Sequence, residues 1–299
     1  MQRSEFDCFF SGMALRHLQR SIRDSLLEDG QDLTTNAVFD RDATMAASIV
    51  AKEGSLMAGL YIVPMVLEET AAVEAGDWGM QAHVDEGVQL SPGTVAISLE
   101  GSARLLLRAE RIMLNFITHL SGIANLVRKY VQALDGTGVR LLDTRKTLPG
   151  LRYPEKYAVL VGGGCNHRLN LAELLMLKDN HIDAAGGIAK AVDMLHKAYN
   201  PSPPIEVECR TPDEVKEAVL CGVSRIMLDN MFEKGGTALM RESLDLIPPH
   251  IEVEISGGVT LENIGEIARA HGKRKADFIS VGRLTHSAPA ADFSMRIGG

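Results

Sequence analysis

After residue 138 the sequence alternates short apolar segments with stretches of helical periodicity, and this alternation limits the fold more than any other feature. The segments follow one another at roughly 20–35 residues, a spacing that suits repeated strand–helix units with parallel strands. We therefore expect an α/β barrel in this part of the chain, one that need not have all eight strands. The expected strands are residues 139–142, 174–177, 205–209, 225–228, 251–255 and 277–281.

Two helices in this region have recognisable starts. Thr211, Pro212 and Glu214 are the residue types of an N-cap, a first-turn proline and a capping-box partner. Thr260 is expected to open the helix after the fifth strand in the same way.

The first third of the chain has a different pattern of apolar residues. A helix is expected around residues 15–27, and short alternating segments at 46–52, 81–85 and 95–100 fit the strands of a small α+β unit. From 103 to 134 apolar residues recur at helical intervals, which predicts one or two long helices connecting two domains. We expect a first domain over residues 1–115, a barrel domain over 116–285 and a C-terminal tail, 286–299, that packs back on the first domain.

Charge and cysteine content narrow the function. Lys plus Arg number 31 against 39 Asp plus Glu, a net charge of −8, which disfavours a nucleic-acid binder or an anionic-membrane binder. An anionic substrate would need a local basic pocket. The 4 cysteines form no CxxC pair, which favours a reducing, cytoplasmic location. No apolar stretch approaches the roughly 18–20 residues of a membrane span.

Each expected barrel strand ends in polar residues, where a barrel enzyme gathers its active site. One polar ending means little, because any loop can be polar. A succession of them favours an active site built from the carboxyl ends of the strands. The endings are DTRKT at 143–147, KDNH at 178–181, Glu206 and Glu208 within the third strand, DN at 229–230, EISGG at 254–258 and VGR at 281–283.

The chemistry of these endings points to a polyanionic substrate. Small residues at 256–258 and 282 let backbone N–H groups approach an anion, and barrels often bind phosphate after their late strands. Glu208 and Asp229 offer carboxylates of the kind that hold ribose hydroxyls, Mg²⁺ or a cationic transition state. A basic set suits carboxylate and phosphate groups. Its members are Arg111, Arg145, Lys146, His167, Arg168 and Lys178.

Several strings carry a family resemblance when they are taken in order. They are RAER at 108–111, HLSGIA at 119–124, DTRKTLPG at 143–150, GGG at 162–164 with NHRL at 166–169, and KDNH at 178–181. Together they resemble the quinolinate phosphoribosyltransferase family, also called nicotinate-nucleotide pyrophosphorylase (carboxylating). The likeness runs from DLTT at 32–35 to THS at 285–287 and so covers nearly the whole chain.

The resemblance implies a fold and a reaction. The fold is an N-terminal α/β sandwich domain followed by an incomplete, open α/β barrel, paired in a homodimer that can assemble further. The reaction joins quinolinate to phosphoribosyl pyrophosphate and gives nicotinate mononucleotide, pyrophosphate and CO₂, with Mg²⁺, in de novo NAD biosynthesis. No pyridoxal phosphate or thiamine is expected.

The resemblance also assigns residues to the two carboxylates of quinolinate and to catalysis. Arg111 would reach across the dimer interface into the partner's site. Lys146, Glu208 and Asp229 would be catalytic, and the two acids would hold the ribose and its Mg²⁺ directly or indirectly. The carboxylates would be bound by Arg145, Lys146, His167, Arg168 and Lys178, with Thr144 alongside.

A second set implied by the resemblance surrounds the 5′-phosphate. Ile255 and Arg283 stand where the family favours smaller side chains, which bears on the packing around this group. The phosphate set is Ser256, Gly257, Gly258, Val281, Gly282 and Arg283, with His286 as a neighbour.

Other functions remain open on sequence alone. The nearest is a sister activity on the same fold, a nicotinate-type phosphoribosyltransferase or the related molybdenum-locus protein. A barrel aldolase would form a Schiff base through Lys178 or Lys146, one of which would need a lowered pKa. A non-catalytic metabolite sensor or scaffold is the remaining alternative, because fold alone does not give function.

Overall fold

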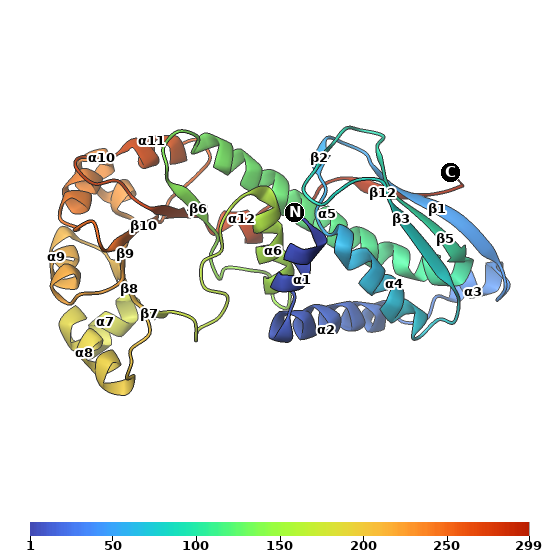
Figure 1. The fold of residues 1–299 in the computed structure, drawn as a ribbon, viewed down its shortest axis with the longest axis horizontal. Coiled ribbons are helices and arrows are strands. Elements are labelled where there is room, and N and C mark those ends of the chain that lie inside the picture. The colour runs from blue at the N-terminus through green and yellow to red at the C-terminus, as the bar shows by residue number, and fades with distance from the viewer. Residues whose placement is uncertain (299) are drawn as a thin grey trace. The chain divides into compact units, whose positions relative to one another are not determined.

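A computed structural model of the chain describes residues 1–298, which form two compact units (Figure 1). The N-terminal unit comprises Met1–Arg128, Thr147–Gly163 and the chain from Arg283 onward. The barrel unit comprises Lys129–Lys146 and Gly164–Gly282.

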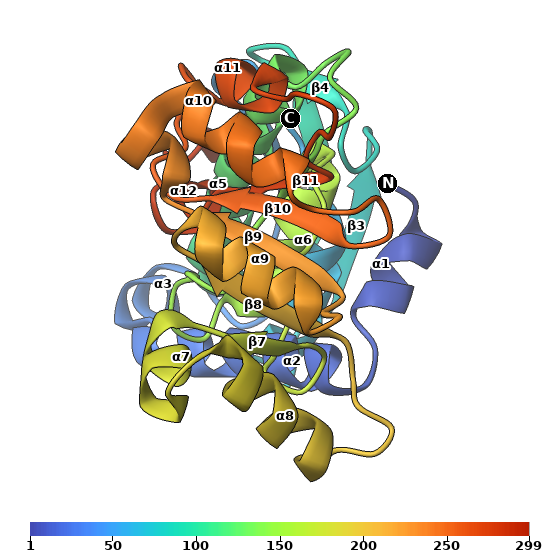
Figure 2. The same cartoon turned by 90° about the vertical axis from the view of Figure 1, so that its left-hand side faces the viewer.

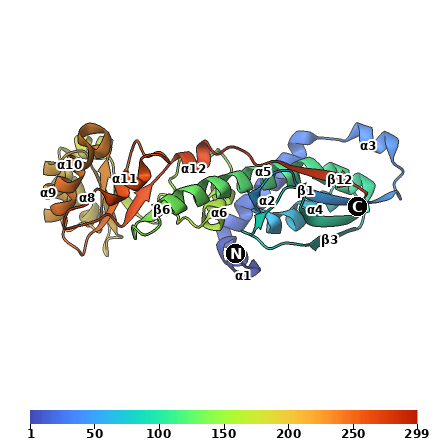
Figure 3. The same cartoon turned by 90° about the horizontal axis from the view of Figure 1, so that it is seen from above.

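The N-terminal unit is built on an antiparallel sheet with the order β12-β1-β5-β3 (Figure 3). The strands are β1 (Thr44–Ala51), β3 (Trp78–Ala82), β5 (Val95–Ser102) and β12 (Phe293–Ile297). β12 pairs with β1 from Ala51 opposite Phe293 to Ala47 opposite Ile297, so the C-terminal strand completes a sheet that begins near residue 44. The strand expected at 81–85 begins three residues earlier, because its pairing with β5 starts at Trp78 opposite Gly101.

Helices pack around this sheet and bury one face each. The helix expected at 15–27 is α2, and its buried residues Ala14, Leu18, Ile22 and Leu26 recur every four residues. That stripe packs against α4 and α6. The helical stretch expected from 103 to 134 is one continuous helix, α5. The helices are α1 (Arg3–Phe9), α2 (Gly12–Asp29), α3 (Leu33–Val38), η1 (Leu60–Ile62), α4 (Val63–Ala71), α5 (Ala103–Ala133), α6 (Arg152–Gly162) and α12 (Arg283–His286), with the short strands β2 (Ser55–Leu56) and β4 (Gln89–Leu90).

One buried carboxylate braces the N-terminal unit. Glu86 is 1% exposed, and its two oxygens accept the N–H groups of Gly59 and Leu60 at 2.7 and 2.8 Å. Gly59 has φ 96°, a left-handed conformation that favours glycine, so the carboxylate supports a backbone turn which other residues adopt poorly. Burial raises the pKa of Glu86 to about 7, although the two N–H donors act in the opposite direction.

The barrel unit is built on a parallel sheet with the order β6-β11-β10-β9-β8-β7 (Figure 2). The predicted strands are all present, with ends that shift by a residue or so. They are β6 (Arg140–Leu142), β7 (Leu175–Leu177), β8 (Ile205–Cys209), β9 (Arg225–Asp229), β10 (Glu252–Ser256) and β11 (Phe278–Ser280). Helices cover the outer face: α7 (Asp179–Ala185), α8 (Ile188–Ala198), α9 (Pro212–Leu220), α10 (Met231–Asp245) and α11 (Ile264–Arg269).

The strand order shows why the barrel is open. β7 to β11 lie side by side in chain order, and β6, the first of the set, pairs with β11, the last. This is the neighbour order of a closed ring. β6 and β7 are not paired to each other, so the ring is interrupted between its first and second strands. The expected open α/β barrel is confirmed.

Of the two predicted helix starts, one is confirmed and one is wrong. The Thr211 hydroxyl accepts the Glu214 N–H at 3.2 Å, as an N-cap does, while the Glu214 carboxylate accepts the Arg210 N–H rather than closing a capping box on Thr211. Thr260 does not open a helix. Its N–H donates to the Asn263 side chain at 2.8 Å, which closes a turn, and α11 starts only at Ile264.

Within residues 1–298, no helix has the length and apolar character needed to cross a membrane. The cysteines of the described chain are all free thiols.

Glu86 gives the fold a predictable pH dependence. Its folded pKa of about 7 lies above the ordinary 4.5, so its stabilising contribution is complete below pH 4.5 and is lost as pH rises through 7. The loss is about 3 kcal/mol at most. Denaturant unfolding of the wild type should show a free energy of unfolding that falls between pH 5 and 8. In Glu86→Gln this fall should be smaller. The exposed Glu28→Gln variant is the control, and an unchanged slope in Glu86→Gln would contradict the assignment.

Candidate functional site

A cavity of about 430 Å³ lies at the carboxyl ends of the barrel strands. This volume is in the range of small-molecule sites. The chain positions that line it are far apart in sequence, and the parallel sheet brings them together. They are Thr144, Arg145, Lys146, His167, Arg168, Met176, Lys178, Met227, Glu208, Asp229, Glu254, Ser256 and Ser280.

Apart from His167 and Arg168, each lining side chain is placed by the strand that precedes or carries it. Residues 144–146 follow β6 and Lys178 follows β7, while Asp229, Ser256 and Ser280 are the last residues of β9, β10 and β11. Glu208 lies one residue before the end of β8. Because side chains alternate along a strand, Glu206 and Glu208 face the barrel interior together, and the apolar residue between them, Val207, faces the covering helices.

The basic side chains of the cavity are Arg145, Lys146, Arg168 and Lys178. Lys178 Nζ lies 2.5 Å from Glu208 Oε1, so an acid and a base of the site neutralise each other across neighbouring strands. Arg168 donates from its guanidinium to the Leu174 carbonyl at 2.8 Å, which ties the loop to the start of β7. Together these groups make a site suited to an anion that carries more than one charge.

A buried aspartate fixes the loop that carries the histidine and arginine. Asp143 is 0% exposed. Its carboxylate accepts the backbone N–H of His167 at 2.8 Å and the side-chain amide of Asn166 at 2.7 Å. The same loop pairs with β6, since Cys165 and Leu141 share a backbone hydrogen bond of 2.8 Å. Residues 165–168 are therefore held against the open edge of β6.

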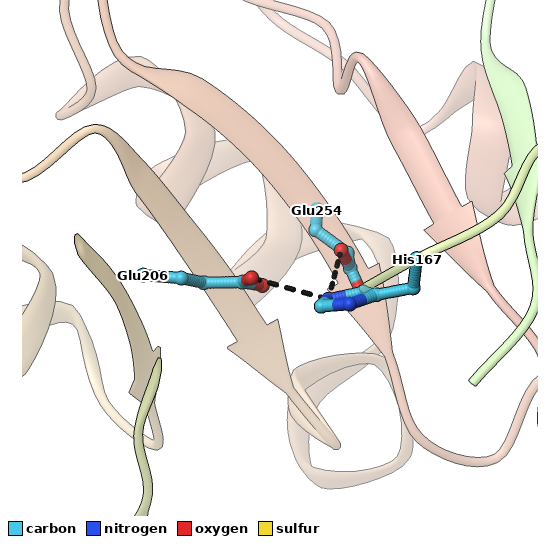
Figure 4. Close-up of side chains that lie close together, drawn as sticks. All are labelled: His167, Glu206 and Glu254. Atoms are coloured by element: carbon cyan, nitrogen blue, oxygen red, sulfur yellow. Dashed lines mark ion pairs between the residues drawn. The ribbon is translucent and has the colours of Figure 1, made fainter. Parts of the chain in front are cut away.

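Inside the barrel, His167 meets two carboxylates (Figure 4). Its Nε2 atom lies 3.1 Å from Glu206 and 3.4 Å from Glu254, both of which are 0% exposed. Arg225 Nη1 lies 3.9 and 3.6 Å from the same two carboxylates. Burial raises the pKa of Glu254 well above its ordinary value, and the neighbouring charge of Glu206 raises it further.

Most of the predicted substrate-binding residues of the barrel unit line this one cavity; some do not. Gly257 and Gly258 lie beside it in the chain with φ of 92° and 60°, conformations that favour glycine. An added Cβ at these positions would clash with Asn230 and Glu233, so close packing is reason enough for both glycines. Val281 is buried at 2% exposure, so any contact it makes with a ligand would come from its backbone. Gly282 follows it and is outside the lining as well.

Three predicted residues belong to the N-terminal unit. Arg111 is exposed on α5, where it lines a hollow with Arg108 and residues 29–34. Arg283 and His286 are exposed residues of α12, and the His286 ring nitrogen Nδ1 lies 2.7 Å from the Ser287 hydroxyl.

The expected metal-binding pair offers two carboxylates. Glu208 and Asp229 share the cavity lining, and Asp229 accepts the Asn230 amide at 2.8 Å. In residues 1–298 the group of three side chains with ligand atoms close enough for an ion is a different one, formed by His167, Glu206 and Glu254. A Mg²⁺ ion held by one or two carboxylates with substrate phosphates is a common arrangement, so the donor set fits.

Sequence reasoning assigned no role to several lining residues. Glu254 stood in a predicted polar strand ending without a role of its own, and Ser280 could have been found, since both follow the period-2 alternation that points polar side chains into a barrel whose outer face is covered. Met176 and Met227 gave no such signal, because an apolar residue in a strand is ordinarily part of the core.

An open α/β barrel with a basic cavity at its strand ends defines an enzyme that acts on a small anionic molecule. Comparison with known proteins identifies the family of this enzyme. The family model "Quinolinate phosphoribosyl transferase, N-terminal domain" matches residues 32–121, and "Quinolinate phosphoribosyl transferase, C-terminal domain" matches 123–296. The chain belongs to the quinolinate phosphoribosyltransferase family.

Curated relatives agree over almost the full length. The chain is 37% identical over 278 residues to nicotinate-nucleotide pyrophosphorylase [carboxylating] of Mycobacterium leprae, covering 92% of this chain and 95% of the relative. It is 38% identical to the probable enzyme of that name from Bacillus subtilis, covering 95% of each. Among solved structures, NadC from Streptococcus pyogenes is 37% identical with a TM-score of 0.84 and covers 96% of this chain and 99% of that one.

The Asp143 interactions predict a local stability effect. Asp143→Asn keeps the shape but points an amide N–H₂ at one of two donors, so it should destabilise the barrel unit by about 1–3 kcal/mol. Denaturant unfolding measures this, with Asp193→Asn as the control because Asp193 is exposed and pairs with Lys197 on the same helix. Equal midpoints for Asp143→Asn and the wild type would show that the carboxylate is not needed to hold residues 165–168.

Proposed function

We infer that this chain transfers a phosphoribosyl group from phosphoribosyl pyrophosphate to quinolinate, with decarboxylation, in NAD biosynthesis. The family and the names of its relatives support this directly. The observation in the structure that carries the inference is the joining of basic and acidic side chains in one cavity, because the reaction needs cations for two carboxylates and acids near a ribose.

The basic side chains are suited to binding the pyridine. Quinolinate carries two adjacent carboxylates, and Arg145, Lys146, Arg168 and Lys178 offer enough donors to pair with both. The Lys178–Glu208 contact would be exchanged for a contact with substrate, so part of the binding energy offsets the loss of an existing ion pair. Orientation of the ring nitrogen toward the ribose follows from holding both carboxylates.

The acidic side chains are suited to the ribose. The pyridine nitrogen forms a bond to C1 of the ribose as the C1–oxygen bond breaks and its electron pair leaves with pyrophosphate. Positive charge develops on the sugar, and Glu208 and Asp229 stabilise it electrostatically. The carboxylate next to the ring nitrogen is then lost as CO₂, the cationic ring accepts the electron pair, and the ring carbon takes up a proton to give nicotinate mononucleotide.

We further propose that Glu208 and Asp229 help to hold Mg²⁺ with the pyrophosphate group. When bound, the ion would neutralise charge on the leaving group. The carboxylates of this pair lie on adjacent strands, β8 and β9, and the remaining ligands would be phosphate oxygens and water.

We propose that the chain works as a homodimer in which Arg111 serves the partner's site. Its exposure on α5 in the N-terminal unit is consistent with this role, and the ordered RAER string that contains it supports the assignment. A cytoplasmic location is also proposed, on the ground that the cysteines of the described chain are free thiols.

A nicotinate-type phosphoribosyltransferase is the second candidate. A human nicotinic acid phosphoribosyltransferase shares the fold at 12% identity and a TM-score of 0.54. Nicotinate has one carboxylate, and a cavity with the basic set Arg145, Lys146, Arg168 and Lys178 favours the substrate with two.

The direct test follows both substrates. Purified protein with phosphoribosyl pyrophosphate and Mg²⁺ should consume quinolinate and form nicotinate mononucleotide, and it should leave nicotinate unchanged. Lys178→Gln should raise the KM for quinolinate roughly ten- to hundredfold, the effect of losing one charged hydrogen bond. The exposed Lys190→Gln variant controls for surface charge. Turnover of nicotinate in place of quinolinate would change the assigned substrate to nicotinate. Turnover of neither would reject the function.

Subunit mixing tests the dimer. When quinolinate is well below the raised KM, Arg111→Ala and Lys178→Ala should each be nearly inactive alone, since each damages every site. If Arg111 serves the partner, a 1:1 mixture after subunit exchange holds half heterodimers with one intact site each, so about a quarter of the wild-type activity returns. Differently tagged subunits verify exchange. Heterodimers that form but stay inactive would place Arg111 in its own subunit's site or in none.

A further inference from the structure

Asn230, the residue that follows β9, has an unusual backbone conformation. Among residues 1–298 it is the one non-glycine residue with a positive φ, which is 55°. This left-handed region costs energy for any residue with a Cβ, although asparagine tolerates it better than most. Residues in sparsely populated conformations cluster at functional sites. The preceding residue, Asp229, lines the cavity, so the strained position lies next to a group that the proposed function uses.

The left-handed conformation ends the strand within one residue. β9 ends at Asp229, which lies opposite Ser256 of β10, and α10 begins at Met231 (Figure 2). The backbone N–H of Asn230 adds one more hydrogen bond between these strands, to the Ser256 carbonyl at 2.9 Å, before the chain turns away. Glycine would make such a turn with less strain, so the turn alone does not explain an asparagine here.

The side chain of Asn230 does not cap the helix that it precedes. An asparagine at the N-cap usually has an extended backbone, and its side-chain oxygen accepts an N–H group of the first turn. Asn230 is the N-cap residue of α10, yet its side chain makes no such hydrogen bond. The amide donates instead to Asp229 Oδ2 at 2.8 Å. The usual contact of an N-cap asparagine is therefore replaced by a contact with a carboxylate of the cavity.

Gly257, which follows β10, leaves room for this side chain. A Cβ added to Gly257 would clash with the side-chain oxygen of Asn230 and with the carbon that carries it. The nitrogen of the amide faces Asp229, as it must, because an amide oxygen in its place would repel the carboxylate. The amide is thus packed against Gly257 at its oxygen end and bonded to Asp229 at its nitrogen end.

We propose that Asn230 is a positioning residue, which holds Oδ2 of Asp229 so that the carboxylate keeps one orientation and Oδ1 meets the ribose or its Mg²⁺. The task of Asp229 rests on the proposed function, whereas the hold on its carboxylate does not. A charge that is fixed in advance stabilises the developing positive charge of the sugar without first having to reorient. Loss of the Asn230 amide should therefore lower kcat. The quinolinate KM should stay about the same, because the basic side chains bind that substrate.

Two variants separate the amide from the backbone turn. Asn230→Gly removes the side chain and suits φ 55°, whereas Asn230→Ala removes the side chain and adds strain. Both should lower kcat roughly ten- to hundredfold, the effect of one hydrogen bond to a charged group, and Asn230→Ala should unfold at the lower denaturant concentration. If Asn230 served only the turn, Asn230→Gly would keep the wild-type kcat. That result would overturn the proposal, as would a raised quinolinate KM with unchanged kcat.

Gly222 offers a matched control in the same unit. Its φ is 66°, it is exposed, and an added Cβ would meet nothing within 4 Å. It precedes β9, whereas Asn230 follows that strand. Gly222→Ala should therefore cost stability, as alanine does at position 230, and leave kcat unchanged. A fall in kcat in Gly222→Ala as large as that in Asn230→Ala would trace the lost activity to stability and overturn the proposal.

A crystal structure of Asn230→Gly tests the positioning without turnover. The backbone at residue 230 should stay left-handed, while the Asp229 carboxylate should rotate from its wild-type orientation or adopt more than one. A carboxylate that keeps the wild-type orientation would overturn the proposal even if kcat fell. If Asn230→Ala does not fold, this structure and the kcat of Asn230→Gly still decide. The orientation of Asp229 does not depend on which substrate the enzyme uses, so failure here is distinct from failure of the proposed function.

Discussion

The charged interior of the barrel is the constraint on which the site depends. Barrel interiors are usually filled by branched apolar residues. Here Glu206, Glu254 and Arg225 occupy inward positions, and burying such charges is costly unless they are paired. Arg225 solves part of the problem, since it binds Glu252 at 2.6 Å, approaches the two buried glutamates and lies over the Phe278 ring at 4.6 Å. His167 Nε2 lies 3.1 and 3.4 Å from the same two glutamates, so this residue joins the cavity lining to the polar interior.

The opening of the barrel makes this arrangement possible. Because the ring is interrupted between β6 and β7, the chain that follows α6 can pair with the edge of β6 at Cys165 and send the next residues inward. Asp143, the residue after β6, then holds that segment by accepting a hydrogen bond from the backbone N–H of His167. A strand inserted in the gap would leave no room for the loop to enter, so the incomplete barrel is a condition of the site and not a defect of the fold.

The sequence was a good guide wherever a local pattern determines structure. Short apolar runs with polar ends predicted every strand of the barrel and most of the residues that line the cavity, since parallel strands place their carboxyl ends at one edge regardless of detail. The prediction failed where a side-chain hydrogen bond, and not the local pattern, determined the backbone conformation. Asn263 closes a turn on Thr260 and delays α11, and no local feature of residues 147–163 indicates that α6 packs with the N-terminal unit. Packing between segments that are far apart in the chain cannot be predicted from the sequence of one segment alone.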